Sequence, residues 1–199
     1  ELRALIRRLA SLGVHEIRFT GGEPTARPDL PELIDEALAC CPYVSLGTNG
    51  VWGEGMAEEL LARHIGRYLV SLDGPEEIND VLRGPGAFAR TMETVDRLLA
   101  SGRNLRVNTV ITRPLLPVLP DFMRWLAGRG VRHLSLIGPR PVGRGAWGQF
   151  AADRPGATEM AAVSHLLGQR QGQTDLQVEF QYGADGGAVA SQNRLAHGQ

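Results

Sequence analysis

Lysine is absent from this chain of 199 residues, in which all 21 basic residues are arginine. Its absence excludes a phosphate-binding P-loop lysine and a Schiff-base lysine on this chain. Apolar runs as long as the roughly 18 residues of a membrane-spanning helix are also missing. The 21 basic and 22 acidic residues give a net charge of −1, which is unlike a general nucleic-acid coat or a polybasic membrane anchor. We therefore expect a cytoplasmic protein with no nucleic-acid or membrane partner.

Cysteine and metal-site patterns are equally sparse. The two cysteines are adjacent, as Cys40-Cys41, and cannot make a disulfide framework. We interpret both as small buried side chains. The five histidines are scattered, with no pair at metal-ligand spacing, and there is no G-x-S-x-G nucleophile elbow. A zinc enzyme and a serine hydrolase are therefore poor interpretations.

Helical and extended patterns alternate along the whole chain. Short β-rich segments are separated by segments with helical spacing of apolar residues, and we expect six strands at 15–20, 43–48, 67–72, 104–112, 132–137 and 176–182. Helical crossovers make consecutive strands parallel, so the fold class is α/β, as an open sheet or a barrel. Neither GxGxxG nor GxxxxGK[ST] is present, which favours a barrel. Six strands are too few for eight-fold closure, so we expect a partial (βα)6 TIM-like barrel.

Unusual residues gather where the expected strands end. The sequences Gly21-Gly22-Glu23-Pro24 and Thr48-Asn49-Gly50 follow the first two strands. Ser71 and Asp73 end the third strand, Asn108 lies within the fourth, and a Gly/Pro-rich stretch with Arg140 follows the fifth. Each piece alone is compatible with a plain turn or a helix cap. Together, on the carboxyl side of parallel strands, they predict a site for a small polar ligand.

The ordered motifs GGEP, TNG, S-x-D-G and V-N-T-V resemble the signature of radical S-adenosylmethionine (SAM) enzymes. The likeness spans about residues 1–145 and is greatest to the branch with SPASM-containing maturases and molybdenum-cofactor cyclase-like proteins. It implies reductive cleavage of SAM to a 5′-deoxyadenosyl radical, used in peptide modification or cofactor maturation. It also implies a peptide or small-molecule substrate and an electron donor such as a ferredoxin or flavodoxin.

Site residues follow from the resemblance position by position. The backbone at Gly21, Gly22 and Glu23, before Pro24, would meet the SAM amino group. Thr48 resembles a residue near the methionine carboxylate, with Asn49 shaping the turn. Ser71 would bind that carboxylate or the ribose with support from Asp73, Asn108 is similar to a ribose contact, and Arg140 is a candidate for cofactor or substrate contact.

The family's 4Fe–4S cluster is bound by CxxxCxxC, and no such motif occurs here. The chain begins at Glu1 rather than at methionine, inside an expected helix at 2–12 that resembles the helix directly after the family's cluster loop. We therefore expect the first barrel strand and the cluster ligands to lie upstream of Glu1, so that this chain alone is inactive. We expect residues 1–183 to form the core and 184–199 to be a tail or the start of a C-terminal extension.

Two other classes stay open. One is a relative that has lost its cluster and serves as a binding or scaffold module. The other is a barrel lyase or isomerase with a phosphate site, for which residues 183–187 (GADGG) are a faint sign. Separately, residues 101–150 carry eight arginines and one acid, which could receive an anionic substrate or could be solvated helix faces. Arg140 and Arg144 are the preferred candidates of that block.

Overall fold

The computed structural model describes residues 1–139, 152–169, 175–181 and 190–191. It divides into two compact units, which are taken one at a time below. The first unit comprises residues 1–71 and 89–105, and the second comprises residues 72–88 and 106–199. No helix in the described part of the chain is long and apolar enough to span a membrane.

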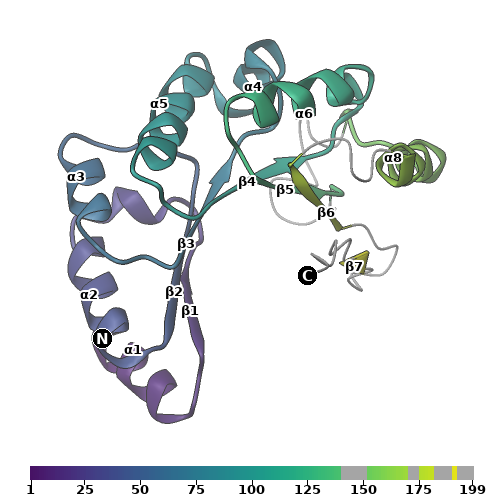
Figure 1. Cartoon of the computed structure of the whole chain (residues 1–199). Helices are drawn as coiled ribbons and strands as arrows, with labels where there is room; N and C mark the ends of the chain where they lie inside the picture. Colours follow the sequence, from purple (N-terminus) through teal and green to yellow (C-terminus); the bar gives the residue numbers. More distant parts are fainter. Residues whose placement is uncertain (140–151, 170–174, 182–189, 192–199) are drawn as a thin grey trace. The chain divides into compact units, whose positions relative to one another are not determined.

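The first unit is a parallel ladder of three strands covered by helices (Figure 1). Its elements are α1 (Leu2–Ser11), β1 (Glu16–Phe19), the 3-10 turn η1 (Pro24–Ala26), α2 (Leu30–Cys40), β2 (Tyr43–Thr48), α3 (Met56–Leu61), β3 (Arg67–Ser71) and most of α5 (Ala87–Ala100). The register sets Ile17 beside Val44, and Leu46 beside Tyr68. These side chains are buried and form the core of the unit together with Ile34 of α2.

The second unit repeats the plan with three parallel strands and one antiparallel strand. Its elements are α4 (Glu76–Arg83), β4 (Leu105–Val110), the 3-10 segment η2 (Arg113–Val118), α6 (Leu119–Gly128), β5 (His133–Ile137), α8 (Ala157–Gln169), β6 (Gln177–Gln181) and β7 (Ala190–Ser191). Val107 pairs with Leu134, and Leu136 pairs with Phe180, in a row of buried apolar side chains.

All six predicted strands are present, and each pairs in parallel with another of the six, so the α/β prediction is confirmed. Two elements escaped the sequence interpretation. One is β7, in the stretch 184–199 that we expected to be a tail or the start of a C-terminal extension. The other is α4, in which Ile78 and Leu82 are half-buried while Val81 is 67% exposed. Polar contacts with Asp73 also hold α4, as described below.

Candidate functional site

The GGEP turn after β1 and the TNG turn after β2 are joined by one carboxylate, that of Glu23. Its Oε1 accepts hydrogen bonds from the Thr25 backbone N–H (3.1 Å), the Thr25 hydroxyl (2.6 Å) and the Thr48 hydroxyl (2.8 Å). Its Oε2 accepts from the Asn49 backbone N–H at 2.6 Å. Glu23 also caps η1, whose first residue is the buried Pro24. Because hydrogen bonds to a charged acceptor are the stronger kind, this carboxylate fixes both strand ends against each other.

The two glycines that precede Glu23 leave their backbone uncovered. Gly21 adopts a φ of +134°, a conformation that side chains other than glycine rarely adopt. A Cβ placed on Gly21 or on Gly22 would meet no atom within 4 Å. The peptide groups of this turn therefore border open space, and a ligand can approach the backbone closely.

The TNG turn is held from within and from α5. The Thr48 hydroxyl, which donates to Glu23, accepts from the Gly50 backbone N–H (3.0 Å) and from the indole N–H of Trp52 (3.1 Å). Asn49 Oδ1 accepts from the Val51 N–H at 2.7 Å, which makes an Asx turn. The hydroxyl of Thr48 is thus engaged in building the turn.

Two threonines of α5 fix the same turn from outside. Thr91 donates to the Asn49 carbonyl at 2.8 Å, and Thr94 donates to the Gly50 carbonyl at 2.7 Å. Gly50 has a φ of +78°, and a Cβ there would lie 3.0 Å from Thr91 Cγ2. Glycine is therefore required at this position both by its conformation and by the closeness of α5.

Ser71 and Asp73, the pair expected after the third strand, have different surroundings. Ser71 is half-buried at the end of β3, in the first unit. Asp73 belongs to the second unit and is fully buried. Its carboxylate accepts from Arg83 Nε at 2.7 Å and from the Val110 N–H at 2.8 Å, while its own N–H donates to Asn79 Oδ1 at 3.0 Å. Asp73 therefore anchors α4 to β4 and offers no exposed atom to a ligand.

Burial and pairing act on Asp73 in opposite directions. Burial raises the pKa of its carboxyl group above the usual range, and the charge of Arg83 and the Val110 N–H oppose that rise. The arrangement places an ion pair inside the fold, with the Asp73 side chain 1% exposed and that of Arg83 24% exposed. Removing either partner would leave the other uncompensated.

Asn108 and Arg140 complete the residues expected from the sequence. Asn108 is half-buried in the middle of β4, and its carbonyl accepts from the Leu72 N–H at 2.9 Å. Arg140 and Arg144 lie outside the described residues. The structure thus directly joins Glu23, Thr48 and Asn49, with Gly21, Gly22, Pro24 and Ser71 in the same unit.

The residues that sequence reasoning missed are those that support the turns. They are Thr25, Thr91 and Thr94 in the first unit and Asn79 and Arg83 in the second. Pro24 at the first position of η1 signalled the turn, but glutamate is not a usual N-cap residue, so the contact of Glu23 with Thr25 gave no standard signal. The α5 threonines gave no local signal, because their partners are 42 and 44 residues away in sequence.

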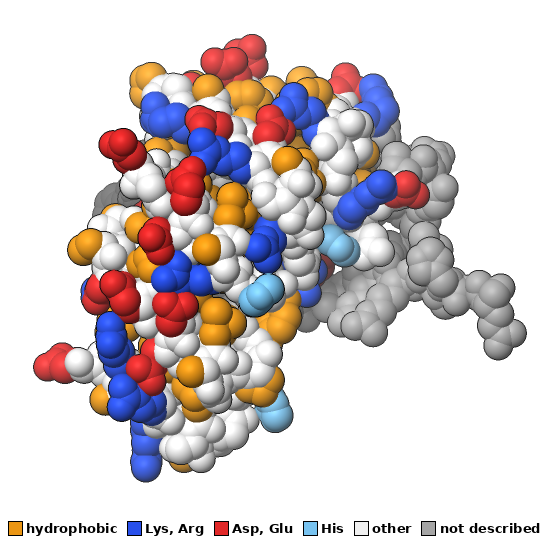
Figure 2. All heavy atoms as spheres, turned by 60° about the vertical axis from the view of Figure 1, so that its left-hand side comes forward, with side chains coloured by type: hydrophobic (Ala, Val, Ile, Leu, Met, Phe, Trp, Pro, Cys, Tyr) orange, Lys and Arg blue, Asp and Glu red, His pale blue; other side chains and the backbone are white. Residues whose placement is uncertain are grey.

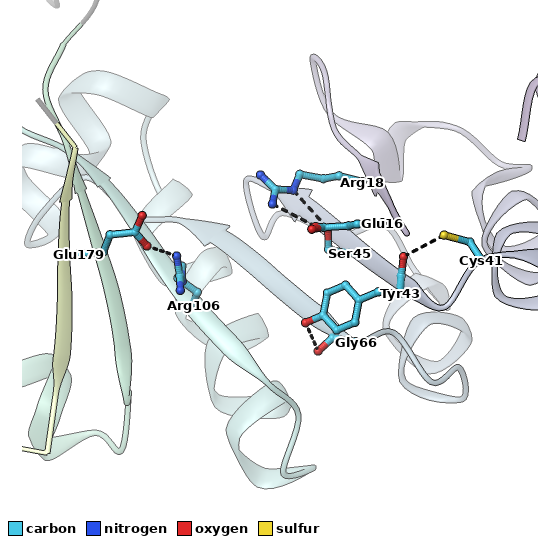
Figure 3. Close-up of polar contacts among 8 residues, drawn as sticks. All are labelled: Glu16, Arg18, Cys41, Tyr43, Ser45, Gly66, Arg106 and Glu179. Carbon is cyan, nitrogen blue, oxygen red and sulfur yellow. Dashed lines mark hydrogen bonds and ion pairs between the residues drawn. The ribbon is translucent and has the colours of Figure 1, made fainter. Parts of the chain in front are cut away.

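The sheet of the first unit has a polar face as well (Figure 3). Ser45 of β2 donates to Glu16 Oε1 at 2.6 Å and accepts from Arg18 Nε at 3.2 Å. The hydrogen bond from Ser45 and the neighbouring Arg18 lower the pKa of the Glu16 carboxyl group, although burial opposes them. Charged and apolar residues alternate in 15–20, and this alternation indicates a polar face, because parallel strands that are buried on both faces have continuous apolar sequences.

The arginines of residues 101–150 are engaged wherever the structure describes them. Arg106, Arg113, Arg124 and Arg132 pair with carboxylates. Arg103 donates to the Leu61 carbonyl, and Arg129 lies 5.5 Å from the Trp125 ring centroid. Figure 2 shows basic and acidic side chains interspersed on the face of the molecule that it turns forward. The described part of the block is therefore not a free cationic surface for an anionic substrate.

The cysteines do not fit an iron–sulfur cluster. Cys40 is exposed, which corrects the expectation of burial, because its position at the end of α2 turns it away from the core. Cys41 is buried as expected. No group of three or more His, Cys, Asp or Glu side chains that could hold a metal ion occurs among the described residues. The residues described here thus supply no ligand set for a 4Fe–4S cluster.

Comparisons with known proteins agree with the geometry. Residues 1–126 match the model of the radical SAM superfamily. Mycofactocin maturase MftC of Mycobacterium ulcerans (strain Agy99) is 36% identical over 168 residues, which are 82% of this chain and 44% of that protein. The GTP 3',8-cyclase of Rhizobium meliloti (strain 1021) is 34% identical over 151 residues, 72% of this chain and 43% of that protein. The chain spans less than half the length of these curated relatives.

Solved structures show the same fold. Native anSMEcpe with bound AdoMet and Cp18Cys peptide has a TM-score of 0.70 at 19% identity, covering 84% of this chain and 50% of that one. Streptococcus suis SuiB bound to S-adenosylmethionine has a TM-score of 0.72 at 17% identity, covering 90% and 42%. The parallel α/β architecture expected from the sequence is the one these enzymes share. The chain belongs to the radical SAM superfamily, as the order of its GGEP, TNG, S-x-D-G and V-N-T-V motifs predicted.

Proposed function

We propose that this chain is the SAM-binding core of an enzyme that modifies a peptide or matures a cofactor. The observation that carries the proposal is the Glu23 carboxylate, which locks the GGEP and TNG turns together while Gly21 and Gly22 border open space. Such a rigid turn with an uncovered backbone suits a small zwitterion, because carbonyl oxygens can accept from an ammonium group. The relatives named above, a maturase and a cyclase that are both over 30% identical, support an enzyme of this kind.

The chain's own residues would divide the work of holding SAM. The carbonyl groups of Gly21, Gly22 and Glu23 would accept from the amino group. Ser71 would donate to the carboxylate or to the ribose, and Asn108 would contact the ribose hydroxyls. Thr48, Asn49 and Asp73 would act indirectly, because their polar groups hold the turns and strands on which the contacts depend. Because these contacts hold the turns in place before SAM binds, less conformational entropy is lost on binding.

When bound, SAM and a reduced 4Fe–4S cluster would supply one-electron cleavage of the sulfur–C5′ bond, with methionine and a 5′-deoxyadenosyl radical as the products. The proposal places the cluster's cysteine ligands outside the 199 residues of this chain, whose only cysteines are Cys40 and Cys41. It further requires an electron donor such as a ferredoxin or flavodoxin. A peptide substrate is supported by the anSMEcpe and SuiB structures, which hold Cp18Cys and SuiA peptides.

The test uses the complete protein rather than this chain. It is reconstituted anaerobically with iron and sulfide, reduced with dithionite and assayed for 5′-deoxyadenosine after addition of SAM. We expect iron uptake and 5′-deoxyadenosine that depends on both dithionite and SAM. Absence of iron uptake and of cleavage would refute the enzyme and favour a binding module that has lost its cluster.

A further inference from the structure

The sheet of the second unit has two chemically different faces. The register aligns Val107 with Leu134 and Val178 on one face. On the other face it aligns Asn108 with Ser135 and Glu179. Side chains of successive strand residues alternate between faces, so this second face also carries His133, which the register pairs with Gln177, and Val110, which it pairs with Ile137. Parallel strands that are buried on both faces are apolar throughout, whereas β4, β5 and β6 each carry polar residues.

An ion pair crosses this polar face above the middle strand. Arg106 of β4 contacts Glu179 of β6 through its Nη1 and Oε2 atoms (Figure 3). Ser135 of β5, which the register pairs with Glu179 and with Asn108, is small and buried. Gln181, two residues along β6, donates from Nε2 to Glu179 Oε1 at 2.8 Å. We call Arg106, Asn108, Ser135, Glu179 and Gln181 the β4–β6 polar cluster.

The cluster retains hydrogen-bonding capacity. The Arg106 and Glu179 side chains are 22% and 33% exposed, so the cluster is accessible at its edge. Arg106 uses one of its five N–H donors on Glu179, and its remaining donors have no partner within the described part of the chain. The Asn108 side-chain amide likewise has no hydrogen-bond partner within the described part of the chain. Asn108, which we propose as a contact of the SAM ribose, pairs with Ser135 in the register and therefore lies on the same face.

Charge decides which ligand fits. The positive charge of Arg106 and the negative charge of Glu179 cancel, so the cluster presents donors and acceptors with no net charge. An anion would find one guanidinium already neutralised and a carboxylate beside it, which repels it. A neutral amide can accept from Arg106 and donate to an oxygen of Glu179 or of Gln181 without that repulsion.

We propose that the β4–β6 polar cluster is a substrate subsite that binds a neutral amide group of a peptide. It deepens the proposed function and depends on it, because the subsite would position the peptide for the reaction of this enzyme. Glu179 is the residue that determines specificity, since its charge cancels that of Arg106. Replacing it by the isosteric glutamine leaves Arg106 uncancelled and turns the cluster cationic.

The test measures two small probes on the complete protein. The protein is labelled with 15N, and the side-chain N–H signals of Arg106, Asn108 and Gln181 are followed by NMR. N-acetylglycinamide is the amide probe and sodium acetate, at matched ionic strength, is the anionic probe. In the wild type we expect saturable shifts with N-acetylglycinamide and weaker binding of acetate. In Glu179→Gln we expect the amide to bind up to about tenfold more weakly, because a neutral oxygen accepts a weaker hydrogen bond than a carboxylate does, and acetate to bind more tightly than the amide.

Glu159→Gln is the matched control, because it makes the same change in an exposed ion pair with Arg113 of the same unit. It should leave both probes unaffected. Three results would each overturn the subsite. The wild type could bind acetate in preference to the amide, Glu159→Gln could have the same effect as Glu179→Gln, or neither probe could cause shifts. SAM cleavage measured on the same samples separates the two proposals: amide binding without cleavage refutes the proposed function alone, and cleavage without amide binding refutes the subsite alone.

Discussion

Oε2 of Glu23 accepts a hydrogen bond from the backbone N–H of Asn49 at 2.6 Å, across 26 residues of sequence. Through this contact, the turn that follows β1 and the turn that follows β2 form one structure. The other oxygen of the same carboxylate accepts from Thr25 and Thr48. Both carboxylate oxygens of Glu23 are therefore engaged by the two turns. Glu23 therefore serves the site through its backbone and through the shape that its side chain imposes.

Glu23→Gln should loosen both turns. The amide NH2 group of glutamine would face either the Asn49 N–H or the donors of Thr25 and Thr48. An NH2 group cannot accept a hydrogen bond, so the bonds on that side would be lost. We expect a loss of about 2 kcal/mol in the free energy of unfolding, measured by urea denaturation of the complete protein. Affinity for SAM should fall as well. Glu32→Gln, on the exposed side of α2, should change neither quantity; equal effects of the two variants would contradict this role of Glu23.

Arg83→Met should lower the free energy of unfolding, because it leaves the buried carboxylate of Asp73 without its ion-pair partner. Loss of one partner from a buried ion pair typically destabilises a protein by about 3–5 kcal/mol, because the other charge stays uncompensated. The pKa of Asp73, already raised by burial, should rise further without Arg83. A raised carboxyl pKa in the folded state stabilises the fold below the unfolded pKa, and that contribution is lost as the pH rises.

The deficit of Arg83→Met in the free energy of unfolding should consequently be largest near neutral pH and shrink on acidification. Urea unfolding at about pH 7.5 and about pH 5 measures this difference. Arg132→Met is the matched control in the same unit, since its ion pair with Asp175 is exposed and should contribute under about 1 kcal/mol. A deficit that is independent of pH would show that Asp73 is not the group left uncompensated.

Ser45→Ala should raise the pKa of Glu16 toward its usual range. The hydrogen bond from the Ser45 hydroxyl is the largest of the influences that lower it. Because the folded pKa is lowered, Glu16 contributes stability above its unfolded pKa and loses it as the pH falls through the folded value, and the variant should show less of this loss. The side-chain carboxyl 13C shift of Glu16 followed against pH gives the measurement. The pKa of Glu36, lowered by Arg7, should not move.

Much of the fold followed from local patterns. Strand Tyr43–Thr48 was predicted to the residue, because its β-rich sequence is bounded by Pro42 and by Asn49-Gly50. The helix α4 was missed because it has only eight residues, and because contacts such as that of Asn79 with Asp73 leave no trace in a periodicity. The same limit applies to Thr91 and Thr94, whose partners are distant in sequence.

The candidate site was predictable in its positions and less so in its roles. The motifs located Gly22, Glu23, Thr48 and Asn49 correctly at the ends of adjacent strands. They gave no sign that the side chains of Glu23 and Thr48 bind each other, since side-chain direction depends on how the two turns pack. The exposed Cys40 shows the converse, where a residue type usually found buried lies at a helix end instead.

The central claim is that the backbone at Gly21–Glu23 binds SAM, and Gly22→Val tests it most directly. A Cβ at Gly22 meets no atom within 4 Å, so the variant should fold, while its side chain would fill the space next to the backbone. Gly53→Val is the matched control, since Gly53 is equally open. Equilibrium dialysis of SAM against the reconstituted complete protein should give binding by the wild type and by Gly53→Val, and none by Gly22→Val. Unchanged affinity in a folded Gly22→Val protein would contradict the account.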